Sequence, residues 1–108
     1  KAYCQFLKMH YNGILIPIND TIMPLASRHQ KTLADIFHRP TSATIKFSDI
    51  EKLVVALGGV IENNDGSRMK FCLNGHATAA HRPHPNKEAK RYQVEDMREF
   101  LQKQGITP

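Results

Sequence analysis

The sequence predicts a small α+β domain in which a three-stranded antiparallel sheet carries two helices on one face. Apolar residues recur at helical spacing in two segments, residues 48–59 and 93–105. Between these segments lie two hairpin turn signals, at 64–66 (Asn-Asp-Gly) and 74–75 (Asn-Gly). The predicted order is therefore helix, strand, strand, strand, helix, with the strands joined as a meander.

The first helix of this unit is expected to begin at Ser48, which forms a capping-box pattern with Glu51. Gly58 or Gly59 can adopt the left-handed conformation that ends a helix. Its apolar stripe consists of Ile50, Leu53, Val54 and Leu57.

The strands follow from alternation and from their turns. Val60 begins the first strand, and a third strand over residues 76–82 ends at Pro83. In the second strand, Met69, Phe71 and Leu73 point to one side, and Arg68, Lys70 and Cys72 point to the other. The two helices must cover the apolar side, so we expect the opposite side to be open, with Cys72 an inert side chain there.

The last helix is predicted over residues 93–105, with Gly105 as its C-terminal stop. Its inward residues are expected to be Val94, Met97, Phe100 and Leu101.

The residues before this unit divide into two pieces. Residues 1–22 show no sustained period, so we expect an extension that is disordered or not native to the protein; a strand that adds to the domain or to a partner is the alternative. In residues 23–44, Ser27 and Gln30 form a capping-box pattern that opens a short helix over 27–39, and a linker follows. Residues 45–108 then form the main domain.

The chain of 108 residues carries a net charge of +5, and its location decides what that charge means. Residues 66–92 supply all of this charge, because they contain six cationic residues and one acidic residue, Glu88. Such a cluster beside an open sheet face favours phosphate binding, with nucleic acid as the first candidate partner, over a merely solvated surface. No apolar run is long enough to span a bilayer, so no membrane partner is expected. The six cations are Arg68, Lys70, Arg82, Lys87, Lys90 and Arg91.

Two short motifs and the end of the final helix follow one another in the basic half of the chain. The motifs are residues 66–71 (Gly-Ser-Arg-Met-Lys-Phe) and 83–88 (Pro-His-Pro-Asn-Lys-Glu), and the helix ends in LQKQGI. Together they resemble the HicA family, and the resemblance covers about residues 45–106. It implies a fold similar to double-stranded-RNA-binding domains and a cytoplasmic bacterial toxin of a type II toxin–antitoxin system. It also implies an mRNA interferase, a hydrolase acting on mRNA, which a HicB antitoxin protein neutralises.

The sequence departs from the family at one position of its usual Gly-Ser-His motif. Arg68 stands where the family has its presumed catalytic histidine. Arginine stays protonated and cannot be the base that activates a 2′-hydroxyl, although it can bind the scissile phosphate. We therefore expect either a rearranged site, with His81 or His84 as acid or base beside Arg68, or a module that binds RNA or its antitoxin without cleaving.

The RNA-binding residues predicted on this basis lie in the basic segment. No metal or cofactor is predicted, because neither cysteine nor carboxylate accompanies His81 and His84 at a typical ligand spacing. A major-groove DNA reader fits poorly, since neither helix is notably basic at its N-terminus. The predicted RNA-binding residues are Ser67, Arg68, Lys70, Arg82, Lys87, Lys90 and Arg91.

Overall fold

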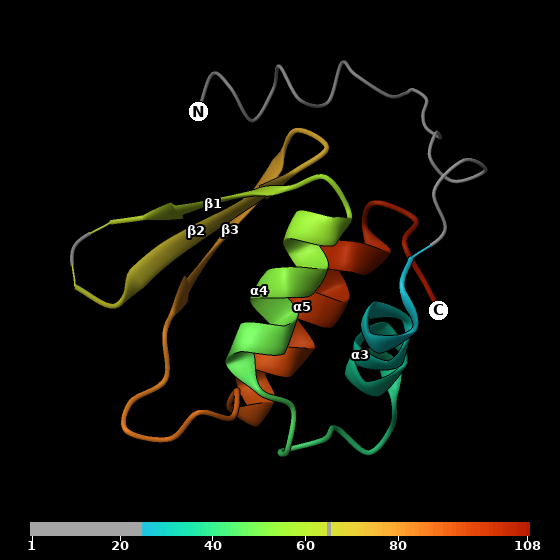
Figure 1. Cartoon of the computed structure of the whole chain (residues 1–108), viewed down its shortest axis with the longest axis horizontal. Coiled ribbons are helices and arrows are strands. Elements are labelled where there is room, and N and C mark those ends of the chain that lie inside the picture. Colours follow the sequence, from blue (N-terminus) through green and yellow to red (C-terminus); the bar gives the residue numbers. More distant parts are fainter. Residues whose placement is uncertain (1–24, 65) are drawn as a thin grey trace.

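The computed structural model describes residues 25–64 and 66–108, which form helices packed on one sheet (Figure 1). The α+β class and the predicted order of the last five elements are confirmed. The predicted extension over residues 1–22 lies outside the described residues. The elements in chain order are α3 (Ser27–Phe37), α4 (Phe47–Ala56), β1 (Val60–Asn63), β2 (Arg68–Leu73), β3 (His76–His81) and α5 (Arg91–Gln102).

The sheet is an antiparallel meander in the order β1-β2-β3, as predicted. Asn74 and Gly75 connect β2 to β3 with φ values of 52° and 81°, the left-handed conformations that a two-residue Asn-Gly hairpin turn requires. This turn places Leu73 opposite His76 and thereby fixes the register of every following pair.

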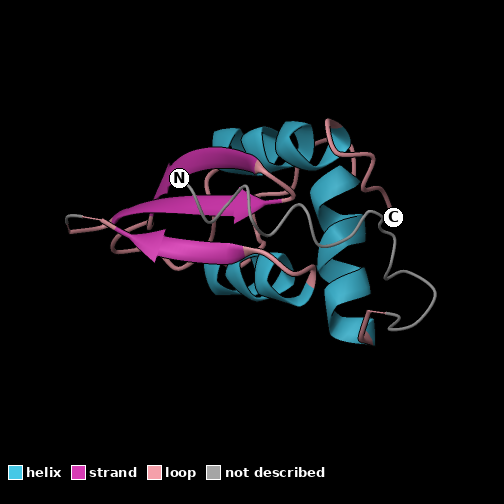
Figure 2. Cartoon of the chain, turned by 90° about the horizontal axis from the view of Figure 1, so that it is seen from above, coloured by secondary structure: helices cyan, strands magenta, loops and turns pink. Residues whose placement is uncertain are grey.

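The core lies between the sheet and two helices. Met69, Phe71 and Leu73 are buried on one face of β2, as the alternation predicts. α4 and α5 lie side by side against that face, and α3 crosses them on the side away from the sheet (Figures 1 and 2). The molecule therefore has a sheet, a central pair of helices and an outer helix. The inward residues contributed by α5 are Val94, Met97, Phe100 and Leu101.

The helix starts differ from the two predicted capping boxes. α3 is preceded by Ala26 and α4 by Lys46, and neither helix has a side-chain cap. The side chain of Gln30 instead donates to the carbonyl that precedes the helix, at 2.8 Å. The carboxylate of Glu51 accepts a 2.9 Å hydrogen bond from Arg82, which is 31 residues away. The prediction of these caps was wrong because the side chains of Gln30 and Glu51 bind other partners, one nearby in the chain and the other Arg82, the residue that follows β3.

The helix ends agree better with the sequence. Gly58 follows α4 with a φ of 97°, and Gly105 follows α5 with a φ of 78°, the conformation expected of both. α3 ends at Phe37, two residues before the predicted limit, and Pro40 follows shortly after.

A buried arginine attaches α3 to α5. Arg98 is 6% exposed, and its Nε donates to the carbonyl of Ile36 at 3.0 Å. Its Nη2 donates to the carbonyl of His38 and to the hydroxyl of Thr41, at 3.3 and 3.1 Å. That hydroxyl in turn donates to Glu95 of α5 at 3.0 Å. The last turn of α3 and the following linker are thus held by one side chain.

The loop between β3 and α5 returns to the start of α4. The backbone N–H of Phe47 donates to the carbonyl of Lys87 at 2.9 Å, and that of Ala89 donates to Ile45 at 2.8 Å. These bonds hold the loop, which carries part of the basic segment, against the start of α4.

No helix in the described part of the chain has the length and apolar character needed to cross a membrane.

Candidate functional site

Arg68 and His81 form a cross-strand pair on the sheet face that points away from the helices. Arg68 is directly opposite His81 in the β2–β3 register, and both residues are exposed. The backbone N–H of Arg82 donates to the carbonyl of Ser67 at 2.8 Å, so the neighbouring pair is hydrogen-bonded. Hydrogen-bonded pairs alternate along an antiparallel ladder, so Arg68 and His81 are a non-hydrogen-bonded pair, the kind whose side chains approach most closely. A guanidinium and an imidazole are therefore carried on neighbouring strands at one end of the sheet.

The rest of this outer face is less open than predicted. Lys70 lies one step further along β2 and is only partly exposed. Cys72 is completely buried, although it points away from the core that Phe71 and Leu73 enter. The expectation of a uniformly open face was therefore wrong at Cys72, and the accessible polar end of the face is the one with Arg68.

Two of the predicted RNA-binding arginines are held by other elements. The guanidinium of Arg82 pairs with the Glu51 carboxylate of α4 at 2.9 Å, with about half of the arginine side chain exposed. The Nε of Arg91 donates to the carbonyl of Thr41 in the linker after α3, at 3.4 Å. Arg82 thus stays near the end of β3 and Ser67, whereas Arg91 lies beside the linker.

The remaining predicted residues lie in the loop after β3. His84 and Lys87 are exposed there, and the carbonyl of Lys87 is bonded to α4 as described above. Lys90 precedes α5, and its backbone N–H donates to the side chain of Gln93 at 2.9 Å. The structure therefore brings Arg68 next to His81 and keeps His84 in the adjoining loop, while the six cations are distributed over several elements.

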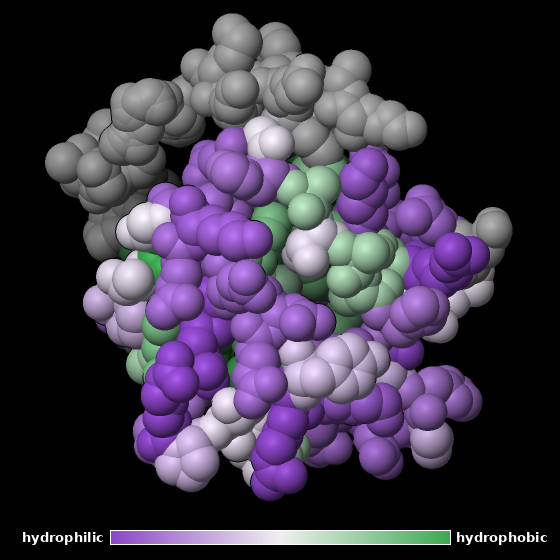
Figure 3. All heavy atoms as spheres, turned by 180° about the vertical axis from the view of Figure 1, so that it is seen from behind, coloured by the Kyte–Doolittle hydropathy of each residue, from purple (hydrophilic) through white to green (hydrophobic). Residues whose placement is uncertain are grey.

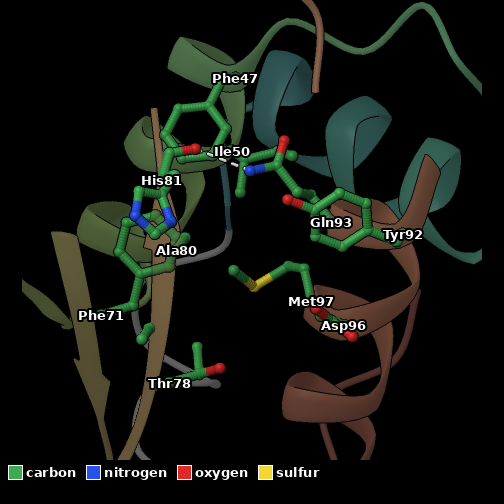
Figure 4. Close-up of a pocket in the computed structure, with 11 residues that line it drawn as sticks. Phe47, Ile50, Phe71, Thr78, Ala80, His81, Tyr92, Gln93, Asp96 and Met97 are labelled. Carbon is green, nitrogen blue, oxygen red and sulfur yellow. Dashed lines mark hydrogen bonds between the residues drawn. The ribbon is translucent and has the colours of Figure 1, made fainter. Parts of the chain in front are cut away.

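A pocket of about 130 Å³ opens between β3 and α5, and the sequence did not point to it. Its floor is apolar and includes Phe71 and Met97, and Met97 reaches from α5 toward the sheet (Figure 4). At its upper end the amide of Gln93 donates to the carbonyl of His81 at 2.7 Å (Figure 4). Its residues come from α4, β2, β3 and α5, so only the tertiary structure assembles it. The other lining residues are Phe47, Ile50, Thr78, Ala79, Ala80, Tyr92 and Asp96.

The His, Cys, Asp and Glu side chains of the described ranges 25–64 and 66–108 are dispersed. In these ranges, no three His, Cys, Asp or Glu side chains come close enough to hold a metal ion together.

On α3, the hydrogen bond to Asp35 and then the charge of that carboxylate raise the pKa of Lys31. This pair lies on the outer helix and not on the sheet.

The pairing of Arg68 with His81 could have been found from the sequence. A two-residue Asn74-Gly75 turn puts residues that are equally distant from it opposite each other. Counting outward from the turn gives the observed pair. The pocket between β3 and α5 has no such signal, because its walls are far apart in the sequence.

Comparison with known proteins gives one match. Neither the curated proteins nor the solved structures yielded a similar chain. The family model of the HicA toxin of bacterial toxin–antitoxin systems matches residues 47–106, which is more than half of the chain. The matched range begins with α4 and ends just after α5, so it covers the complete αβββα unit, whose fold is of the double-stranded-RNA-binding-domain type. This chain belongs to the HicA toxin family.

Proposed function

We propose that this protein is the toxin of a toxin–antitoxin pair and that it binds and cleaves mRNA at the outer sheet face around Arg68. Family membership supports the toxin role. The observation that carries the site is the cross-strand pair of Arg68 and His81, because it places a residue that can accept a proton beside one that is always positively charged.

The proposed chemistry is attack of an RNA 2′-hydroxyl on the adjacent phosphate. His81 takes the proton of the hydroxyl as the O2′–P bond forms, and the P–O5′ bond breaks. Arg68 binds the non-bridging phosphate oxygens and stabilises the charge that develops on them. His84, exposed in the loop after β3, is the candidate for returning a proton to the departing 5′-oxygen. In this mechanism Arg68 on β2 binds the phosphate, and His81 on the neighbouring strand β3 is the base.

RNA binding beyond this pair is proposed for the basic segment. Ser67, Lys70 and Arg82 adjoin the pair through the two strands, and Lys87, Lys90 and Arg91 extend from the loop to the start of α5. A HicB-like antitoxin is the proposed protein partner, and the cytoplasm, where mRNA is found, is the proposed location. Cations that bind phosphate give affinity that falls steeply with salt.

Cleavage of a labelled mRNA by the purified protein tests the site directly. His81→Ala is expected to abolish cleavage, and Arg68→Ala to slow it by about 100-fold or more, as the loss of a transition-state contact does. His76→Ala is the matched control, because His76 is exposed at the other end of the same strand. Arg68→His restores the residue that the family motif has, and it is expected to retain or increase cleavage. Equal cleavage by the wild type and by His81→Ala would contradict the role of His81.

The basic surface is tested separately by RNA affinity. A Lys70→Ala/Lys87→Ala double variant is expected to bind RNA more weakly and with a shallower salt dependence, by about one unit of slope per lost contact. Unchanged affinity and slope would remove these two lysines from the interface without affecting the cleavage argument.

The second candidate is a non-catalytic module that binds RNA or its antitoxin. The observation that favours it is arginine at position 68, which cannot accept a proton. RNA that stays intact at high protein concentration, yet is bound, supports this candidate. Gain of cleavage in Arg68→His would then show that the substitution at this position is what silenced the enzyme.

A further inference from the structure

Two adjoining pockets between β3 and α5 form a groove along the edge strand of the sheet, which we call the β3–α5 groove. The first is the apolar pocket described above, and the second, of about 190 Å³, is lined by residues 76–78 and by the outer side of α5. Thr78 and Asp96 line both pockets and mark their junction. Seen from behind, the surface carries a hollowed apolar area among hydrophilic side chains, on the side where β3 and α5 lie (Figure 3).

The edge of β3 presents unpaired backbone groups beside this groove. The bond from Arg82 to Ser67 makes residues 82, 80, 78 and 76 the ones whose backbone groups face β2. The N–H and C=O groups of Ala77, Ala79 and His81 therefore point outward. The bond that Gln93 makes to the outward carbonyl of His81 agrees with this geometry. Within the described part of the chain, the outward groups of Ala77 and Ala79 have no partner.

The charge of the groove differs from that of the chain as a whole. Asp96 stands exposed at its centre, and no described residue forms an ion pair with it. Glu99 lies next along the helix and is paired only loosely with Lys103, at 3.6 Å. A carboxylate without a counter-ion in a chain of net charge +5 favours a cationic partner and disfavours a phosphate backbone.

The apolar pocket has the size of one side chain. A cavity of about 150 Å³ lined by leucine, isoleucine and phenylalanine holds a benzene molecule, so about 130 Å³ suits an aliphatic or small aromatic side chain. Tyr92 forms part of its rim and is 56% exposed, and Met97 of the floor is a side chain that adapts to different shapes.

We infer that the β3–α5 groove binds an extended peptide segment of a protein partner, which adds as a strand to β3 along Ala77–Ala79. Backbone bonds to these two residues give the affinity, and alternate side chains give the specificity. Side chains two residues apart lie on the same face about 7 Å apart. One apolar side chain therefore enters the pocket while a lysine or arginine two residues away reaches Asp96. This inference does not depend on RNA cleavage, because the peptide is held by Ala77, Ala79 and Asp96, which lie outside the Arg68–His81 pair; His81 only lines the upper end of the pocket.

A random heptapeptide phage library selected on the full chain provides the probe. The expected outcome is enrichment of sequences with an aliphatic or aromatic residue two positions from a lysine or arginine. A synthetic peptide of the enriched sequence is then titrated against variants of the groove. Ala79→Pro removes an outward N–H without touching the ladder, and it is expected to weaken binding about fivefold or more. Asp96→Lys is expected to weaken the basic peptide and to favour the same peptide with glutamate in place of the basic residue.

The matched control is Asn63→Pro, because the N–H of Asn63 also points outward but lies on the opposite edge of the sheet. This variant is expected to bind the peptide as the wild type does, and circular dichroism confirms that all variants are folded. The inference is wrong if no common pattern is enriched, or if Ala79→Pro and Asp96→Lys bind like the wild type. It is also wrong if Asp96→Lys alters RNA affinity but leaves peptide affinity unchanged, since the groove then belongs to the RNA interface.

Discussion

Replacing the buried Arg98 tests how α3 is held to the rest of the molecule. Arg98→Met keeps most of the aliphatic stem and removes the three hydrogen bonds to Ile36, His38 and Thr41. Each such bond contributes about 1 kcal/mol net, so the free energy of unfolding is expected to fall by about 3 kcal/mol. The loss is not compensated by water at Ile36, which is completely buried. For a domain of this size, the melting temperature should fall by roughly 12 to 24 °C.

The assay is urea unfolding followed by circular dichroism, with thermal melting as the second measurement. Arg91→Met is the matched control, because Arg91 is exposed and makes one long bond of 3.4 Å to Thr41. It should change the free energy of unfolding by less than about 0.5 kcal/mol. Hydrogen exchange should show faster exchange in α3 of Arg98→Met. A loss below 1 kcal/mol, or a loss equal to that of the control, would refute the view that Arg98 anchors this helix.

Two further substitutions probe the packing around the sheet. In Gly59→Ala the new Cβ would lie 2.7 Å from both the carbonyl oxygen of Cys72 and the Cγ1 of Val54, so overpacking should cost about 1 to 3 kcal/mol in a urea titration; an unchanged midpoint would contradict the close approach. Glu51→Gln breaks the partly exposed pair with Arg82, so the free energy of unfolding should fall by less than about 1 kcal/mol, and less at high salt. A larger loss that is independent of salt would mean that this pair is more than a surface contact.

The element order was predictable because its signals are local. Apolar periodicity placed α4, the alternating strand β2 and α5, and Asn74-Gly75 set the turn between β2 and β3. The same turn also sets the register that pairs Arg68 with His81, and this pair is found by counting residues outward from the turn along both strands. The start of the helices was not predictable in this way, since a capping residue such as Glu51 is taken by a partner that only the fold brings near.

By itself, the sequence determined the αβββα order and the apolar face of β2, and it predicts from the resemblance a departure from the family motif at position 68. Each of these depends on residues that are neighbours in the chain. Only the tertiary structure decided that Arg98 would be buried as an anchor, that Arg82 would pair with α4, and that β3 and α5 would enclose a groove centred on Asp96. These features join segments tens of residues apart, and their contacts exist only once the helices have packed on the sheet.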